Sequence, residues 1–250
     1  MRLSYLRQQC LELWLSTKGG VGLLIDPQNL GFAMNVEDGF IHHKANKLAV
    51  EYIKSDPGVA QIFAEQYLAP LPDMDALLKL PTNSLGYAYA DRTILSGFNP
   101  HFYASRPLNF SYQKDTRDDP TYMLVRMRQS HDIWHVMTGF GMDVYGEIGL
   151  KAFEIAQVGN TAAFIIVLGA LVLNIFKSPE NLQDLLTHII IGYQMGRKAK
   201  PFLAQKWEEN WDKPLAEWRT ELNITPYSRS KEKSLNKVEL APQNQHLINA

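Results

Sequence analysis

The 250-residue sequence contains a single cysteine, Cys10, and its formal net charge is only −1 at pH 7. One cysteine excludes an internal disulfide framework and any zinc site built on several cysteines, and it fits a reducing compartment. A chain with balanced charge lacks the basic excess that is typical of nucleic-acid-binding proteins, so we expect no nucleic-acid partner. With 46% hydrophobic residues, the chain is long enough to bury a full core.

Strand-like alternation of polar and apolar residues is also scarce in this sequence. Helical periodicity interrupted by glycine and proline dominates instead, and it predicts an all-α fold with a single domain over residues 1–223. Residues 224–250 are rich in serine, asparagine, glutamine and lysine, which predicts a polar and mostly disordered tail. We find no internal repeat and no glycine-rich phosphate loop.

The N-terminal residues lack the features of a secretory signal, because polar side chains interrupt their apolar residues and no small-residue cleavage site follows. Helical spacing of the apolar positions predicts an amphipathic first helix packed on the core, and a membrane-facing helix is the alternative. These positions are Leu3, Leu6, Cys10, Leu13 and Trp14. Since no transit segment precedes them, we expect a cytoplasmic protein, peripheral on the inner face of the membrane.

Prolines, glycines and helix-capping residues divide the rest of the chain into helices and loops. Residues 18–40 are expected to form a loop, and residues 98–119 an ordered aromatic loop. Asp56 and Asp119 each precede a proline, the pattern of a helix N-cap and first residue, and Gly139 should end the central helix. Helices are expected over residues 46–52, 57–68, 73–80, 85–95, 120–138, 143–157, 158–176, 180–199 and 202–222.

Residues 158–176 carry no charge and are just long enough to span a bilayer. Two asparagines and two glycines dilute the segment, which favours a buried core helix instead. A helix that is apolar on all sides needs cover on every side, and an apolar ligand could supply part of that cover. We therefore expect this helix to line a lipid groove.

The central helix contains the string H-D-x-x-H, and eleven residues separate its last histidine from Glu147. His131 and His135 are four residues apart and share one helix face, so two imidazoles can bind one divalent ion. Asp132 lies on the same side, and the glycine-rich turn at 139–141 allows Glu147 to face back. Two imidazoles and two carboxylates suit zinc, iron or manganese better than magnesium or calcium. The opposite face carries an apolar stripe for the core: Met123, Met127, Trp134 and Met137.

Other interpretations of these residues remain open. Glu147 with Lys151, and Arg128 with Asp132, are spaced as ordinary helical salt bridges.

The motif H-D-x-x-H is close to the H-E-x-x-H of zinc proteases, but the usual downstream ligands are missing. The adjacent His-Asp pair is also found in HD-type phosphohydrolases, which would need partners such as His101 and Asp184. His42, His43, His101 and His188 are interpreted as ordinary core or surface residues.

The string H-D-x-x-H-x11-E resembles the family of the fourth coenzyme Q (ubiquinone) biosynthesis protein and its bacterial relatives. Further segments between about residues 85 and 222 share this resemblance. They are D-x-R-x-D-P, Y-M-L-V-R-M-R-Q-S, L-K-A-F-E, G-Y-Q-M-G-R-K-A-K and W-E-E-N-W-D-K-P-L-A-E-W-R. The resemblance is therefore specific, and it leaves out the polar tail.

The resemblance implies an all-α fold and one divalent metal, which would be zinc, iron or magnesium, held at His131, Asp132, His135 and Glu147. It also implies a groove for a polyprenyl chain, peripheral membrane contact, a homodimer and contact with other quinone-biosynthesis enzymes. The family is linked to oxidative decarboxylation at ring C1 of a prenylated hydroxybenzoate, and another view is a non-catalytic lipid-binding scaffold.

The same four metal-competent residues are our candidates for catalysis. Arg128 lies on the metal face and could pair with the substrate carboxylate. Arg197 belongs to a basic helix end that could meet lipid headgroups or a prenyl phosphate, although favourable charge at a helix C-terminus explains it too. The candidate substrate-binding residues are Arg128, Lys151, Tyr193 and Arg197.

Overall fold

Helices carry the regular structure of the computed structural model, which describes residues 2–27, 29–95 and 118–228. No β-strand occurs within these ranges, so the predicted all-α fold is confirmed. In chain order the α-helices are α1 (Arg2–Ile25), α2 (Leu30–Phe40), α3 (Lys44–Ile53), α4 (Pro57–Glu65), α5 (Met74–Leu77), α6 (Leu85–Leu95), α8 (Asp119–Thr138), α9 (Val144–Val158), α10 (Thr161–Lys177), α11 (Leu182–Lys198) and α12 (Leu215–Glu221). Two 3-10 turns, Pro179–Asn181 and Trp207–Glu209, complete the set.

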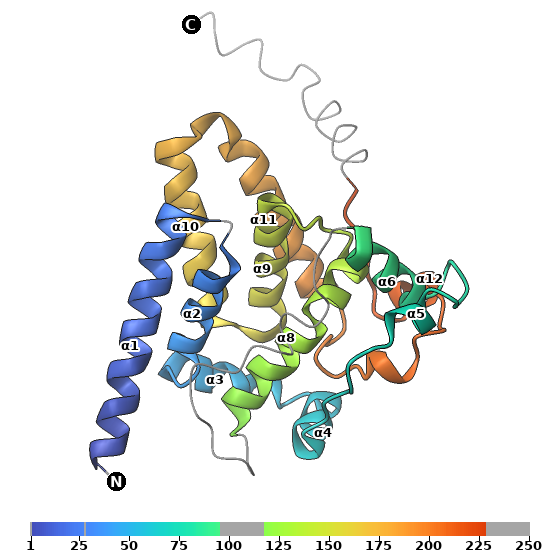
Figure 1. Ribbon diagram of the computed structural model, residues 1–250, viewed down its shortest axis with the longest axis horizontal. Helices are drawn as coiled ribbons and strands as arrows, with labels where there is room; N and C mark the ends of the chain where they lie inside the picture. Colours follow the sequence, from blue (N-terminus) through green and yellow to red (C-terminus); the bar gives the residue numbers. More distant parts are fainter. Residues whose placement is uncertain (1, 28, 96–117, 229–250) are drawn as a thin grey trace, which may run out of the picture.

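The central helices α8 and α9 lie between two groups of helices (Figure 1). On one side, α2 packs against both α1 and α10, and α10 also packs on α9. On the other side, the shorter helices α5, α6 and α12 gather beside α8. This arrangement buries α8 from both sides, as the sequence predicts for a helix with polar ligands on one face and an apolar stripe on the other.

Glycines allow two helix pairs to approach closely. A Cβ atom at Gly192 of α11 would lie 2.0 Å from the carbonyl oxygen of Gly149 on α9. A Cβ atom at Gly19 of α1 would lie 2.6 Å from the carbonyl oxygen of Phe32 on α2. Neither position can carry a side chain without moving a backbone. The expected loop over residues 18–40 is therefore wrong: Gly19, Gly22 and Gly39 lie where α1 and α2 pack closely.

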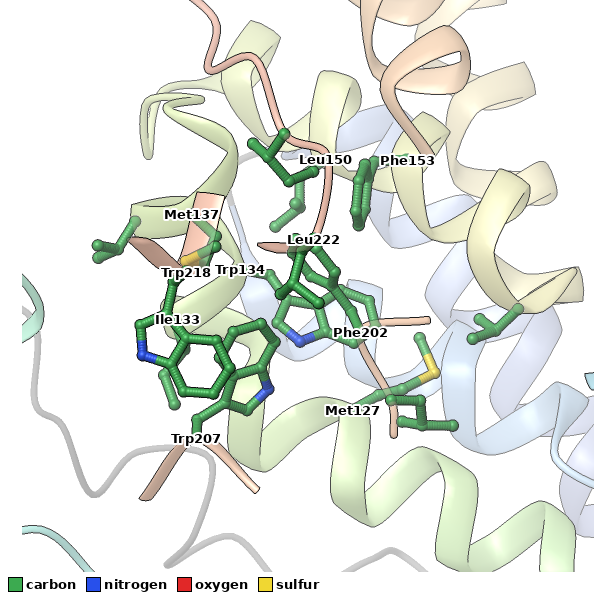
Figure 2. Packing of buried hydrophobic residues seen from close by; sticks show 14 of the residues in the cluster. Met127, Ile133, Trp134, Met137, Leu150, Phe153, Phe202, Trp207, Trp218 and Leu222 are labelled. Carbon is green, nitrogen blue, oxygen red and sulfur yellow. The ribbon is translucent and has the colours of Figure 1, made fainter. Parts of the chain in front are cut away.

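Aromatic side chains from α8, α9 and the C-terminal segment form the main core (Figure 2). Trp134 packs edge-on against Phe153 and Phe202, and Phe202 contacts Trp207. The sequence predicts a helix over 202–222 that Pro214 bends or splits. The part before Pro214 is wrong, because Phe202 and Trp207 belong to an irregular segment with one short 3-10 turn, and only α12, after Pro214, is α-helical. The predicted apolar stripe of α8 is confirmed, since Met123, Met127, Trp134 and Met137 are all buried.

Helix α8 begins one residue earlier than predicted. The side chain of Asp118, rather than Asp119, accepts a hydrogen bond from the backbone N–H of Thr121 at 3.0 Å and caps the helix. The end of α8 is as predicted, because Gly139 has φ 79° in the left-handed region that favours glycine. Asp56 caps α4 as expected, but a left-handed Gln66 ends that helix before Leu68.

Two helices expose apolar residues that the sequence predicts to be buried. On α1, Leu6, Leu13 and Trp14 face away from the core. On α10, Phe164, Leu168, Ile175 and Phe176 are exposed. The prediction that both helices pack these residues on the core is wrong, because α1 buries its glycine face and α10 buries the side that carries Ala163 and Ile166.

The packed part of the chain extends past residue 223. Ile224 is buried, and Tyr227 stacks on Phe140 with ring centroids 5.1 Å apart. The predicted aromatic loop at 98–119 lies outside the described residues except for its last two, and the predicted tail lies outside them from residue 229. Within the described ranges, no helix is both long and apolar enough to cross a membrane.

Candidate metal centre

Helices α8 and α9 bring His131, His135 and Glu147 to one point. The Nε2 atom of His135 lies 3.1 Å from Glu147 Oε1, and the Nε2 atom of His131 lies 3.6 Å from Glu147 Oε2. The two imidazole rings stand edge to face with centroids 4.8 Å apart. The helical spacing of the histidines and the turn after Gly139 thus produce the convergence that the sequence predicts.

Each imidazole has a second partner at its Nδ1 atom. His131 Nδ1 lies 3.1 Å from Asp132 Oδ1, and His135 Nδ1 lies 3.3 Å from the carbonyl oxygen of Phe140. A hydrogen bond donated by Nδ1 leaves Nε2 as the metal-binding atom of a neutral imidazole. Asp132, predicted as a fourth ligand, therefore lies in the structure as a hydrogen-bond partner of His131.

The electrostatics of the group favour an ionised carboxylate. Burial alone would raise the pKa of Glu147, but attraction to His135 and then to His131 outweighs it and lowers the pKa to about 2. Burial would likewise lower the pKa of His131, and the hydrogen bond with Asp132, together with the charge of Glu147, raises it instead. The carboxylate is thus available as an anionic ligand at neutral pH.

These residues fit a divalent metal ion. One ligand atom from each of His131, His135 and Glu147 lies within 4.8 Å of the others. The buried Nε2 atom of His135 makes no hydrogen bond despite its proximity to Glu147. A buried polar atom without a hydrogen bond is costly in a folded protein, and a metal ion at this point would satisfy it. The structure thus contains a His/His/Glu group that could hold a metal.

A cavity of about 360 Å³ opens beside this group. Its polar wall contains His131, Asp132, Glu147 and Lys151, together with Asn29 and Asp143, and Glu147 keeps 26% of its side chain exposed. The rest of the wall is largely apolar and comes from four helices, with Leu23, Leu30, Ala33, Val144, Ile148 and Ile166. The volume lies in the usual range of small-molecule sites. A ligand in this cavity would touch the candidate metal ligands and an apolar surface at once.

Arg128 and Lys151 belong to a buried ion-pair network that the sequence does not predict. Arg128 binds Glu37 at 3.0 Å and Asp38 at 2.9 Å. Lys151 binds Glu37 at 3.0 Å and Glu154 at 2.9 Å. The predicted pairs Arg128–Asp132 and Glu147–Lys151 do not form, because α2 supplies Glu37 between the two cations. Arg128 does not line this cavity, whereas Lys151 does.

The other two predicted substrate residues lie elsewhere. Tyr193 and Arg197 are exposed on α11, and neither lines the cavity. Asp184 is also exposed on α11, and its suggested partner, His101, lies outside the described residues. The structure therefore brings the predicted metal residues and Lys151 to one site, but not Tyr193 or Arg197.

The remaining described histidines have structural partners, as the sequence predicts. His42 contacts Glu12 and Asp118, His43 caps α3, and His188 is buried beside Phe140. None of the three belongs to the metal-competent group.

Several residues around the site could not be predicted from the sequence. Glu37 and Asp38 fall in a segment predicted to be a loop, and Arg92 is far along the chain from the motif. Arg92 donates to the carbonyl oxygens of His135, at 3.2 Å, and of Phe140. No local spacing could have revealed these contacts, since they join residues 43 or more positions apart. Only the charges of Glu37 and Asp38 in an otherwise apolar stretch gave a signal.

The chain is similar to known proteins of one family. The family model described as coenzyme Q (ubiquinone) biosynthesis protein Coq4 matches residues 22–228. A mitochondrial ubiquinone biosynthesis protein COQ4 of Zygosaccharomyces rouxii is 35% identical over 62% of this chain and 44% of its own length. The mitochondrial COQ4 homolog of Bos taurus is 33% identical over 72% of this chain and 65% of its own length.

One solved structure is also similar to this chain. It is the crystal structure of a Nostoc punctiforme protein named for ubiquinone biosynthesis, with a TM-score of 0.70 and 29% sequence identity to this chain. The superposition covers 83% of this chain and 95% of the Nostoc punctiforme chain. The chain spans about 44% to 65% of the length of the curated relatives named here. Because the family match extends over most of the chain and includes the whole metal-competent group, the protein belongs to the Coq4 family of ubiquinone biosynthesis proteins.

Proposed function

We propose that this protein binds one divalent metal at His131, His135 and Glu147 and acts on a polyprenylated precursor of ubiquinone. In the proposed reaction, the carboxylate at ring C1 leaves as CO2 and a hydroxyl takes its place. This is a two-electron oxidation of the ring carbon, and we propose O2 as the oxidant, which is reduced to H2O2. The observation that carries the proposal is the position of two imidazoles and a carboxylate on the wall of a largely apolar cavity. A prenylated hydroxybenzoate has the matching parts, a polar ring and an apolar tail.

The ligand set favours zinc or iron over magnesium, because two of its three donors are imidazole nitrogens. When bound, the metal would supply Lewis-acid or redox chemistry at the substrate ring. Asp132 and the Phe140 carbonyl hold the two imidazoles with their Nε2 atoms toward Glu147. Asp132 lines the cavity as well, so it could complete the ligand set by a change of side-chain rotamer.

Lys151 is the cation best placed to attract the substrate carboxylate, because its side chain lines the cavity together with His131 and Glu147. Arg128 would act at a distance, by holding Glu37 beside Lys151. The apolar wall would take the first part of the prenyl tail, and each buried CH₂ group would contribute about 0.8 kcal/mol. Tyr193 and Arg197 remain proposals for contacts outside the cavity.

The exposed apolar residues of α1 and α10 support peripheral membrane contact, since large exposed apolar patches are typical of interaction sites. We place the protein at the inner, cytoplasmic face of a membrane, as a homodimer beside other quinone-biosynthesis enzymes. The same surfaces favour the second candidate function, a non-catalytic scaffold that binds prenyl lipid and organises those enzymes.

The test compares wild-type protein with Glu147→Gln, and with Glu180→Gln as an exposed control. Metal per chain is measured by elemental analysis after dialysis against zinc or iron, and binding of a prenylated hydroxybenzoate by equilibrium titration. Wild type and the control should carry about one metal per chain, and Glu147→Gln should lose it while its circular dichroism is unchanged.

The outcomes separate the two functions. Metal binding together with turnover of the prenylated hydroxybenzoate supports the enzyme. Metal and lipid binding without turnover under any redox condition supports the scaffold. Absence of metal from wild type, or full retention by Glu147→Gln, would contradict the proposed metal site.

A further inference from the structure

We infer that Arg92 is a positioning residue for the candidate metal centre, and this inference rests on the proposed metal at His131, His135 and Glu147. Arg92 lies in the last turn of α6, and its side chain is half-buried. It touches neither the cavity nor any of the three ligand atoms. It acts through the carbonyl oxygen of Phe140.

The ring of His135 is oriented by a hydrogen bond at Nδ1. Its Nδ1 atom lies 3.3 Å from the Phe140 carbonyl oxygen, and this acceptor requires a proton on Nδ1. The lone pair of the neutral ring is then on Nε2, which faces Glu147. The orientation and tautomer of this ligand therefore depend on where the Phe140 carbonyl points.

The Phe140 carbonyl is in turn held in place by Arg92. Phe140 follows the left-handed Gly139, where the backbone has left the helix, so no helical hydrogen bond fixes its carbonyl. The guanidinium of Arg92 donates to it through Nη2 and to the His135 carbonyl through Nη1. One planar group thus spans the helix end and the turn, and it holds the acceptor at a fixed place beside the imidazole.

A second arginine provides a matched control. Arg219 of α12 also binds the end of α8, through the carbonyl oxygens of Val136 at 2.7 Å and Met137 at 3.0 Å. It does not contact the Phe140 carbonyl. Both arginines therefore satisfy carbonyls at one helix end, and only Arg92 contacts the acceptor of the His135 ring.

The experiment measures the Kd for Zn²⁺ of the full chain, by competition with a chromophoric chelator, in wild type, Arg92→Met, Arg92→Lys and Arg219→Met. Both methionine variants should lower Tm. Only substitutions of Arg92 should weaken zinc binding, by about 10- to 100-fold for Arg92→Met, the range for lost outer-shell partners of metal ligands. Arg92→Lys keeps the charge but not the planar fork, so it should weaken binding too.

Several results would overturn the inference. Equal Kd values for Arg92→Met and Arg219→Met would make Arg92 a helix cap only. Tighter zinc binding by Arg92→Met, with Arg92→Lys unchanged, would show that its positive charge simply repels the ion. If wild type binds no zinc, the proposed function falls as well, whereas normal wild-type binding confines the failure to Arg92.

A measurement on wild type does not depend on the folding of any variant. In ¹⁵N-histidine-labelled, zinc-loaded protein, long-range ¹H–¹⁵N spectra should show His135 protonated at Nδ1 and bound to zinc through Nε2. Zinc ligation through Nδ1 would contradict the inference, because the Phe140 carbonyl would then have no proton to accept.

Discussion

Helices α8 and α10 differ in which side chains they bury. On α8, the polar residues Arg126, Arg128 and His135 are buried, and Arg128 is only 8% exposed. On α10, which has no charged residue before Lys177, Leu168 is 58% exposed and Phe176 is 82% exposed. The more polar helix thus occupies the centre of the molecule, and the more apolar one presents a face to the outside.

The difference in burial follows from the partners that the fold brings to each side chain. Arg126 binds Glu208 at 2.6 Å, and Arg128 binds Glu37 and Asp38, so each buried guanidinium has carboxylates beside it. A buried charge is tolerated when it is paired and hydrogen-bonded. The outer face of α10 has no described helix over it, and α10 meets α1, α2, α9 and α11 with its other side. Burial in this protein follows the supply of partners more than hydropathy.

The largest effect is expected for the buried pairs of α8. Arg128→Met should leave Glu37 and Asp38 with reduced compensation and lower the free energy of unfolding by about 3–5 kcal/mol. Urea denaturation at neutral pH measures it. Arg197→Met, which changes an exposed arginine of α11, is the control and should stay within about 0.5 kcal/mol of wild type. A similar small loss for Arg128→Met would mean that Lys151 alone neutralises the two carboxylates.

A smaller effect is expected at the start of α8, where His42 lies between Glu12 and Asp118. Burial would lower the pKa of His42, but hydrogen bonds with Asp118 and Glu12 outweigh it and raise the pKa to about 9. A pKa raised on folding contributes stability that is complete below the unfolded value of about 6.5 and is lost as the pH rises through about 9. Because Asp118 is half-exposed, solvent screening limits the contribution to about 1–2 kcal/mol.

Unfolding free energies of wild type and His42→Gln between pH 6 and pH 10 test this contact. The difference between the two proteins should be largest near pH 6 and should vanish near pH 10, since His42 is then neutral in both states. A difference that is constant over the whole range would show that the imidazole contributes by packing and not by charge.

The smallest effect on stability is expected on the outer face of α10. Leu168→Gln keeps a good helix former at an exposed position, so the free energy of unfolding should change by less than about 0.5 kcal/mol. Binding to liposomes, measured by flotation, should nevertheless decrease if this face contacts a membrane. If Leu168→Gln instead lowers the free energy of unfolding by several kcal/mol, this face of α10 is covered in solution, for example by a second copy of the chain.

Local patterns in the sequence predicted much of the fold and the core of the site. The spacing of His131 and His135 placed them on one helix face, and the glycines at 139 and 141 allowed Glu147 to return to them. The N-cap at Asp56 and the helix end at Gly139 follow from single residues and their neighbours. Each of these features is decided within one or two helical turns, where backbone sterics and hydrogen bonds dominate.

Other features depended on residues that are distant in sequence. The glycines before residue 40 indicated a loop, but they allow α1 and α2 to pack closely. The charge-free segment of α10 indicated a buried helix, but no described element covers its outer face. Propensity and hydropathy describe a segment by itself, whereas helix packing and burial depend on what lies beside it.

The sequence by itself determined the helical class through its periodicity and the family through the resemblance of its motifs. It also placed His131, His135 and Glu147 among the four residues predicted to hold a metal, because their spacing is local. Only the tertiary structure decided that Glu37 joins Arg128 to Lys151, that Asp132 contacts His131, and that Arg92 holds the carbonyl beside His135. The physical reason is that a buried charge or imidazole is fixed by whichever partner the fold brings within hydrogen-bonding distance. That partner can come from any helix, so its position along the chain carries no signal.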